Sequence, residues 1–211
     1  MYIRTFKDWT LTELENAFGL KQQWDCPLLQ AWQQGTVEIK PFEKEYLLQL
    51  QRSLIRGGRA WNEIELENKF ISPVIMTADI DDEQISYFLE RNLSAVIGDY
   101  EMSGIVDGMI ATGFREPNTP FFCLHEYKRA LENQGTPDAQ VLAAMLAARE
   151  KNHNTMPIYG LFVVGVIWNF IVLNHDTYCI SGEYKATDNE LFAIFTMLKT
   201  LKNIIKEKLI S

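Results

Sequence analysis

The sequence predicts an α/β protein in which a mixed central sheet of about four or five strands is flanked by helices. Three observations favour this fold class. Helical patterns open and close the chain, β-rich runs occupy its middle, and an alanine-rich helix separates two groups of strands. The chain has 211 residues, of which 47% are hydrophobic and 23% charged, so it can bury a core of its own.

Residues 1–58 are expected to form an N-terminal helical segment. Thr10 and Glu13 have the spacing of a capping box, and Pro41 suits the first turn of a long helix. Gly57 and Gly58 should end that helix, because glycine is strongly disfavoured in a helix interior. We therefore place a boundary there and expect a second domain over residues 59–211.

The second domain should begin with a helix over residues 60–71 and a short helix over residues 83–92. The first helix should end before Pro73, since a residue that precedes proline avoids the helical region. Three β-rich runs then follow, over residues 94–100, 104–112 and 121–128. The sequence predicts turns between them at residues 101–103 and, with glycine and proline, at residues 113–120.

Three further elements complete the predicted order. Pro137 should open a helix over residues 139–152, whose alanine and leucine content favours helix. Residues 158–173 are apolar but fewer than the roughly 20 that a membrane helix needs, and their β-branched side chains predict two buried strands. The last helix, after residue 190, has one apolar stripe and several lysines near its end, where cations suit the helix dipole.

Composition restricts the classes of function. Twenty basic residues against 28 acidic ones give a formal charge of -8, so any contact with nucleic acid must be local. The chain has three cysteines, Cys26, Cys123 and Cys179. Their odd number and the absence of metal-finger spacing favour reduced thiols. The first residues lack the apolar core of a signal peptide, so we expect a cytoplasmic protein with no membrane partner. The chain contains neither a phosphate-binding GxxxxGK[ST] loop nor a serine-hydrolase motif.

Two glutamates of the helix over residues 60–71 are placed on its apolar side. At about 100° per residue, Glu63 and Glu67 project between Leu66 and Ile71, although a polar face is available opposite. Like charges four residues apart repel, and a buried carboxylate is costly unless a cation or donor meets it. A partner is therefore expected. The alternative is a pair of rim carboxylates that reach solvent or bind a neighbouring arginine.

A second group of charges lies on the last two predicted strands of the middle region. If these strands form a hairpin centred between Glu116 and Pro117, Asp107 lies opposite Glu126 at about 5 Å. Lys128 shares the face of Glu126, because alternate side chains of a strand point the same way. Two such carboxylates suit Mg²⁺, and Lys128 could orient or deprotonate a bound water or stabilise charge on a phosphate. The alternative is a surface salt bridge of little energetic value.

The order of these residues resembles that of the PD-(D/E)XK nuclease superfamily. A helical Glu63, a strand Asp107, the sequence Glu126-Tyr127-Lys128 and a helical Gln140 follow the superfamily's pattern. The stretch NEIELENKFISPVI is also similar to the nuclease domains of type I restriction subunits. The resemblance covers residues 60–173 and implies a restriction-endonuclease-like core.

The sequence departs from the superfamily at two places. Val106 stands where the superfamily has a proline, and Ala144 leaves the Gln-x-x-x-Tyr pattern of one branch incomplete. The resemblance implies metal-dependent hydrolysis of DNA phosphodiester bonds, in restriction or defence. The implied roles are Asp107 and Glu126 as direct Mg²⁺ ligands, Lys128 as catalytic lysine, Glu63 as a ligand through water with Glu67 as its substitute, and Gln140 as a residue that orients the site or contacts the nucleic-acid backbone.

The expected partners and the alternative function follow from the same resemblance. DNA is the expected substrate and RNA a second one, with Mg²⁺ as cofactor and Mn²⁺ as its substitute. Because the chain lacks a motor motif, a motor or specificity subunit would have to come from a partner protein, and a homodimer is a further expectation. The alternative is a catalytically idle module of the same fold that binds protein or nucleic acid.

Overall fold

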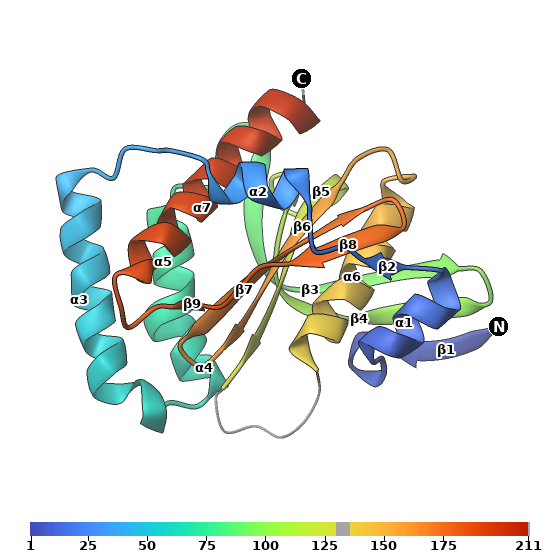
Figure 1. The fold of residues 1–211 in the computed structure, drawn as a ribbon, viewed down its shortest axis with the longest axis horizontal. Coiled ribbons are helices and arrows are strands. Elements are labelled where there is room, and N and C mark those ends of the chain that lie inside the picture. Colours follow the sequence, from blue (N-terminus) through green and yellow to red (C-terminus); the bar gives the residue numbers. More distant parts are fainter. Residues whose placement is uncertain (130–135, 211) are drawn as a thin grey trace.

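The computed structural model describes residues 1–129 and 136–210, which form a mixed sheet flanked by helices (Figure 1). The described part of the chain contributes nine strands to this sheet, more than the four or five predicted. The strands are β1 (Tyr2–Thr5), β2 (Lys21–Gln22), β3 (Ile85–Ile97), β4 (Tyr100–Thr112), β5 (Asn118–Lys128), β6 (Ile158–Val164), β7 (Ile167–Asn174), β8 (Thr177–Ile180) and β9 (Tyr184–Lys185). The α/β fold class is confirmed. Four of the strands have only two to four residues, too few for a recognisable pattern.

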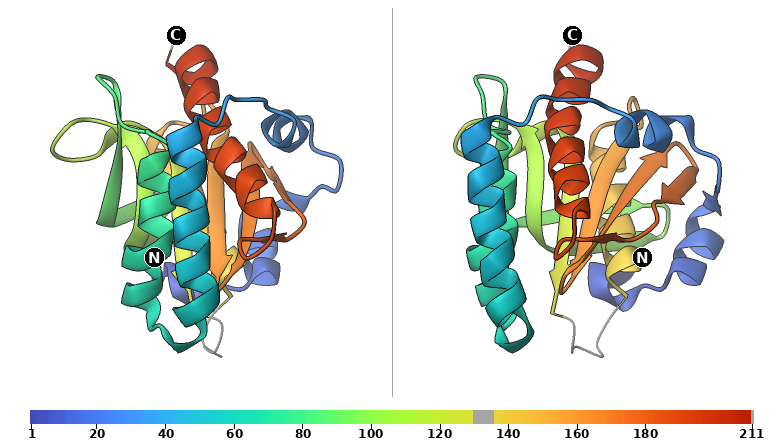
Figure 2. Two further views of the ribbon diagram at one scale, coloured as in Figure 1. Left: turned by 90° about the vertical axis from the view of Figure 1, so that its left-hand side faces the viewer. Right: turned by 60° about the vertical axis from the view of Figure 1, so that its left-hand side comes forward.

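Helices cover both faces of the sheet (Figure 2). The α-helices are α1 (Leu11–Phe18), α2 (Pro27–Gln33), α3 (Pro41–Gly57), α4 (Glu63–Leu66), α5 (Ser72–Thr77), α6 (Pro137–Lys151) and α7 (Glu190–Ile204). Short 3-10 turns are η1 (Phe6–Asp8) and η2 (Gly58–Ala60), and π-helical segments are η3 (Glu67–Ile71) and η4 (Ile205–Leu209). One core lies between the sheet and α2, α3, α4, α5 and α7, and a second core lies beneath α1 and α6.

The sheet runs in the order β1-β4-β5-β6-β7-β8-β2, with β3 on the free edge of β4 and β9 on β7. The pairs β1–β4, β5–β6 and β2–β8 are parallel, and the others are antiparallel. Helix α6 lies between β5 and β6 in the chain and so provides the crossover that a parallel pair needs. Because β3 pairs along the whole of β4, β1 and β5 share the opposite edge of β4.

Several predicted elements are present where the sequence places them. Thr10 and Glu13 form the capping box of α1, and α3 ends at Gly57. Residues 158–173 form β6 and β7, and none of the helices in the described residues is long and apolar enough to cross a membrane. The segment before residue 58 is not only helical, since it supplies β1 and β2 to the central sheet. The domain division at residue 58 stays a prediction.

The short helix predicted over residues 83–92 is wrong. These residues belong mostly to β3, which forms a long hairpin with β4. The turn lies at Gly98, with φ of 56°, and not at residues 101–103 as predicted. A glycine at the start of a two-residue turn is what a tight hairpin favours. Aromatic and β-branched residues pair with β4 and override a sequence that also fits a helix.

The helix predicted over residues 60–71 does not stop before Pro73. It passes through η3, where the Ser72 N–H donates to Glu67 O five residues earlier, and continues as α5 to Thr77. Pro73 lies in the first turn of α5, where a missing N–H costs little. The wider π-helical turn therefore allows the chain to remain helical across the proline.

The prediction of three reduced thiols is also corrected. The structure joins Cys26, which precedes α2, to Cys179 of β8, whereas Cys123 is a buried free cysteine. The two joined cysteines are 153 residues apart in sequence. Their proximity depends on how α2 packs on the sheet, which spacing along the chain does not reveal.

Candidate functional site

The predicted charged residues meet where β4 leaves β5, a place that we call the β4/β5 fork and define by Asp107, Glu126 and Lys128. Gly108 lies opposite His125, which is the register expected from a turn centred between residues 116 and 117. On the N-terminal side of Gly108, β4 no longer pairs with β5, and its first residues pair with β1 instead. Meanwhile β5 continues to Lys128 and pairs there with β6. The predicted register thus holds from Gly108 to Ile110, and the pairing ends beside Asp107. Nearer the turn the register shifts, so that Thr112 lies opposite Asn118.

Asp107 takes over a hydrogen bond that a neighbouring strand would otherwise supply. Its Oδ2 atom accepts from the Tyr127 backbone N–H at 2.6 Å. A buried backbone N–H without an acceptor is costly. The Asp107 carboxylate supplies the acceptor for the Tyr127 N–H, where β4 no longer pairs with β5. The bond also places the Asp107 side chain next to the residues on either side of Tyr127.

Glu126 and Lys128 form a buried ion pair with the helical Glu63 nearby. The Glu126 side chain is 3% exposed, and its Oε1 lies 2.6 Å from Lys128 Nζ as an ion pair, without the angles of a hydrogen bond. Lys128 Nζ is also 3.8 Å from Glu63 Oε1. Glu63 begins α4, whose N-terminus is capped by Asn62. The structure therefore brings Glu63 of the helix to the strand residues.

Negative charge is in excess at the fork. Burial and the charge of Asp107 raise the pKa of Glu126 to about 8. Burial likewise raises the pKa of Asp107 to about 6, although the Tyr127 N–H acts in the opposite direction. Burial works to lower the pKa of Lys128, but the Glu126 carboxylate outweighs it and holds that pKa above its ordinary value. One ammonium thus faces several carboxylates that repel one another.

Glu67 lies on the same side of its helix as Glu63 but faces different neighbours. Burial and repulsion by Glu90 and Glu63 raise the pKa of Glu67, and its charge also acts on Asp107. Glu63 contacts Lys128, whereas Glu67 lies towards Glu90 on β3. Both glutamates of the predicted apolar face therefore reach the site region.

Glu90 is a site residue that the sequence reasoning missed. Leu89 lies opposite Gly108 and Arg91 opposite Val106, so Glu90 lies across from Asp107 on the neighbouring strand. Its φ of 51° is left-handed, which is uncommon for a residue other than glycine. The segment was interpreted as a helix. The signal that could have found Glu90 is Gly98-Asp99, a hairpin turn between two β-rich runs.

Gln140 is not brought into contact with the other predicted residues. It lies in the first turn of α6 and is partly buried, and its backbone N–H donates to Thr136 O. Its side chain forms no hydrogen bond with Asp107, Glu126 or Lys128, all of which the structure describes. The predicted role of Gln140 gains no geometric support.

The fork fits a hard divalent cation by the chemistry of its donors. Within residues 1–129 and 136–210, no three His, Cys, Asp or Glu side chains are close enough to form a complete metal cluster. Mg²⁺, however, is commonly held by one or two carboxylates and keeps several waters. Asp107 and Glu126 supply two such carboxylates, and a cation would relieve their repulsion. These residues can therefore hold Mg²⁺ without a third ligand in place.

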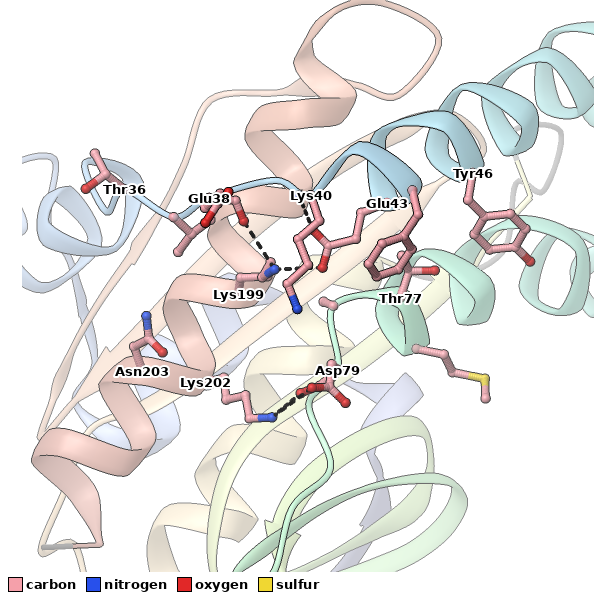
Figure 3. Close-up of a pocket in the computed structure, with 14 residues that line it drawn as sticks. Thr36, Glu38, Lys40, Glu43, Tyr46, Thr77, Asp79, Lys199, Lys202 and Asn203 are labelled. Carbon is pink, nitrogen blue, oxygen red and sulfur yellow. Dashed lines mark hydrogen bonds and ion pairs between the residues drawn. The ribbon is translucent and has the colours of Figure 1, made fainter.

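A large cavity of about 630 Å³ lies elsewhere, between the segment before α3, the end of α5 and α7 (Figure 3). Two of its lysines already pair with carboxylates of the same cavity. Lys199 Nζ is 2.8 Å from Glu43 Oε1, and Lys202 pairs with Asp79. At the fork, burial and the charge of Asp107 raise the pKa of Glu126, so we place the candidate chemistry there and not in the cavity.

In comparisons with known proteins, no family model and no curated protein matches this chain. The resemblance to the PD-(D/E)XK superfamily therefore depends on the sequence pattern over residues 60–173 alone.

Proposed function

We propose that this chain is a Mg²⁺-dependent nuclease that hydrolyses phosphodiester bonds of DNA, in restriction or defence. One observation carries the proposal. A buried Glu126–Lys128 pair meets Asp107 and Glu63 at the end of β5, where burial and the charge of Asp107 raise the pKa of Glu126. Apart from Gln140, these are the residues that the superfamily resemblance implies, on a helix and two adjacent strands.

Asp107 and Glu126 would hold the metal. When bound, Mg²⁺ supplies a Lewis acid that polarises a phosphoryl oxygen and lowers the pKa of a bound water. The Tyr127 N–H keeps one Asp107 oxygen in place, which leaves the other oxygen for the cation. Glu63 would bind through water, with Glu67 as its substitute.

Lys128 would act as a fixed positive charge. Its pKa is raised, so it carries a proton at neutral pH in the metal-free protein. An ammonium stabilises the negative charge that develops on a phosphate, and this effect is strong in a site with little water. The Lys128 side chain is 18% exposed, enough to reach a bound substrate.

Binding of DNA would be local and sensitive to salt. The net charge of -8 gives no general attraction for a polyanion. The lysines of α7 and η4 cannot be counted as free phosphate contacts, because Lys199, Lys202 and Lys206 pair with Glu43, Asp79 and Asp82. A partner with motor or specificity function, or a second copy of the chain, would add affinity.

A catalytically idle module of the same fold is the second candidate. The acidic balance and the incomplete metal cluster in the described residues favour it. In that case Glu126 and Lys128 would serve only as a buried salt bridge. The two candidates differ in one measurable property, the binding of divalent cations.

The experiment combines calorimetry with Mg²⁺ and Mn²⁺ and cleavage of double-stranded DNA, single-stranded DNA and RNA. We expect Glu126→Gln to lose both metal binding and cleavage, because a direct ligand is removed. Lys128→Met should retain metal binding and lose cleavage. Lys202→Met is the control, since Lys202 is equally exposed at 18% and pairs with Asp79, which is not one of the fork residues.

Two results would reject the nuclease. Cleavage that persists in both fork variants would come from a contaminant. Absence of metal binding together with absence of cleavage of all three substrates would leave the idle module.

A further inference from the structure

A buried network of three side chains lies directly beside the β4/β5 fork. Tyr127 OH is 2.8 Å from His125 Nδ1 and 2.9 Å from Tyr87 OH. His125 and Tyr127 are each 1% exposed and lie on the face of β5 opposite Glu126. Tyr87 belongs to β3, so the network joins β3 to β5 across β4.

The intervening strand is shaped to admit this network. A Cβ atom on Gly108 would lie 2.9 Å from both His125 Nδ1 and Tyr87 Cε2. Only glycine therefore leaves room for the two rings to meet over β4. Three polar groups occupy a place where apolar side chains would avoid the desolvation cost, which indicates a role beyond filling space.

The hydrogen bonds of the network have one favoured direction. The His125 ring is buried, with 1% of the residue exposed, and its Nδ1 meets the Tyr127 hydroxyl. Its Nε2 has no partner in the described residues, and a buried N–H without an acceptor costs more than an unused lone pair. The proton therefore lies on Nδ1, which donates to the Tyr127 oxygen, and the Tyr127 hydroxyl donates to Tyr87.

The network fixes a residue whose backbone holds Asp107. On one side Tyr127 is paired with Val163 of β6, but on the other side β4 has left and only Asp107 Oδ2 accepts its N–H, at 2.6 Å. Side-chain anchoring through Tyr87 replaces the missing strand pairing. Any movement of residue 127 would move both the Asp107 oxygen and the flanking Glu126 and Lys128.

We propose that Tyr127, held by His125 and Tyr87, is a positioning residue for the Asp107 carboxylate at the fork. The inference builds on the proposed function, because the positioned carboxylate is the metal ligand named there. Outer hydrogen-bond partners of metal ligands commonly change affinity or activity 10- to 100-fold when removed. Tyr127 itself touches neither metal nor substrate.

The test compares Tyr127→Phe with Tyr178→Phe. Tyr178 is equally buried at 1%, and its hydroxyl donates to Glu15 Oε1 at 2.8 Å, far along the sheet on β8. Each variant removes one buried hydroxyl, so a general loss of packing affects both. The three readouts are hydrogen exchange of the residue 127 amide, calorimetry with Mn²⁺, and the separation of kcat from KM with DNA.

We expect Tyr127→Phe to speed exchange of the residue 127 amide about 10-fold, to weaken Mn²⁺ binding about 10-fold and to lower kcat with little change in KM. Tyr178→Phe should leave all three at wild-type values. Nitrogen NMR of His125 should show the proton on Nδ1 in the wild type. If Tyr127→Phe does not fold, Tyr87→Phe takes its place in the test, because it removes one hydrogen bond of the same network.

Unchanged amide exchange and unchanged Mn²⁺ affinity in Tyr127→Phe would overturn the inference. An equal response of Tyr178→Phe would do the same, since the effect would then be general. If the wild type binds no Mn²⁺ but residue 127 exchanges faster only in the network variants, the positioning of Asp107 stands and the nuclease fails. The two proposals are thereby separated.

Discussion

Two buried lysine–glutamate pairs of this molecule are alike in geometry and opposite in electrostatics. Lys128 and Glu126 at the fork lie 2.6 Å apart, with side chains 18% and 3% exposed. Lys199 of α7 and Glu43 of α3 lie 2.8 Å apart, with side chains 19% and 3% exposed. The pKa of Glu43 is nevertheless lowered, whereas that of Glu126 is raised to about 8. Equal burial therefore does not decide the charge state.

The neighbours of each glutamate account for the difference. Burial works to raise the pKa of Glu43, but hydrogen bonds from Lys199 and from the Lys40 N–H outweigh it. Glu126 has Lys128 but also Asp107, whose charge adds to the effect of burial. The first pair is a satisfied contact between helices. The second is held under repulsion, which costs stability and is typical of functional sites.

The largest expected effect is the loss of the satisfied pair. Glu43→Gln should lower the free energy of unfolding by about 3 kcal/mol, because removal of one partner leaves Lys199 buried without its counter-charge. Urea denaturation at pH 7 measures this change. A loss no larger than that of an exposed ion pair would show that the two pairs do not differ as described.

The same substitution at the fork should have the opposite sign. Glu126→Gln removes a carboxylate that burial and Asp107 disfavour, and Lys128 keeps the carboxylates of Glu63 and Asp107 as counter-charges. The substitution should therefore raise the free energy of unfolding by about 2 kcal/mol at pH 7. The measurement is urea denaturation in parallel with Glu43→Gln, without divalent cations. Destabilisation by Glu126→Gln would mean that Glu126 is a structural ion-pair partner like Glu43.

The pH dependence of stability should separate the two glutamates in a third way. A carboxyl with a raised pKa contributes stability below its ordinary value of 4.5, and this contribution is lost as the pH rises towards about 8. Glu43 acts in reverse, since its lowered pKa contributes stability above 4.5 that is lost as the pH falls.

Thermal unfolding from pH 2 to pH 9 tests these slopes. Glu126→Gln should remove about 2 kcal/mol of the decline between pH 4.5 and about 8 and leave the slope below pH 4.5 unchanged. Glu43→Gln should flatten only the slope below pH 4.5. A decline between pH 4.5 and about 8 that persists in Glu126→Gln would assign it to another group.

Local patterns were sufficient to bring the charged residues of the fork together. A hairpin centred between Glu116 and Pro117 predicts the pairing of Gly108 with His125, although the register shifts nearer the turn, and strand alternation places Lys128 with Glu126. Helical periodicity identified Glu63 and Glu67 as carboxylates on the apolar face of their helix. Each of these inferences needs only residues close in sequence.

Features that depend on distant packing were not predictable. The pair between Lys199 and Glu43 joins residues 156 apart, and no spacing rule selects that glutamate among the many in the chain. Glu90 and Tyr87 were not predicted as site residues, because the first half of β3 fits a helix as well as a strand and only pairing with β4 decides. Where β4 diverges from β5, β1 pairs with β4 instead. β1 has only four residues, too few for a pattern that could be recognised in the sequence.

The smallest expected effect is that of Mg²⁺ on stability. If Asp107 and Glu126 bind the cation in the folded state only, Mg²⁺ at ten times its dissociation constant should raise the free energy of unfolding by about 1.4 kcal/mol. A cation also cancels the repulsion between the two carboxylates, so the gain should be lost in Glu126→Gln and in Asp107→Asn. Glu43→Gln should keep it in full, since its own loss of stability arises in the other pair. Differential scanning calorimetry with Mg²⁺ and with an equal ionic strength of Na⁺ measures the gain. A similar gain from Na⁺, or one that survives in both fork variants, would assign it to general screening and return the fork to a salt bridge like that of Lys199 and Glu43.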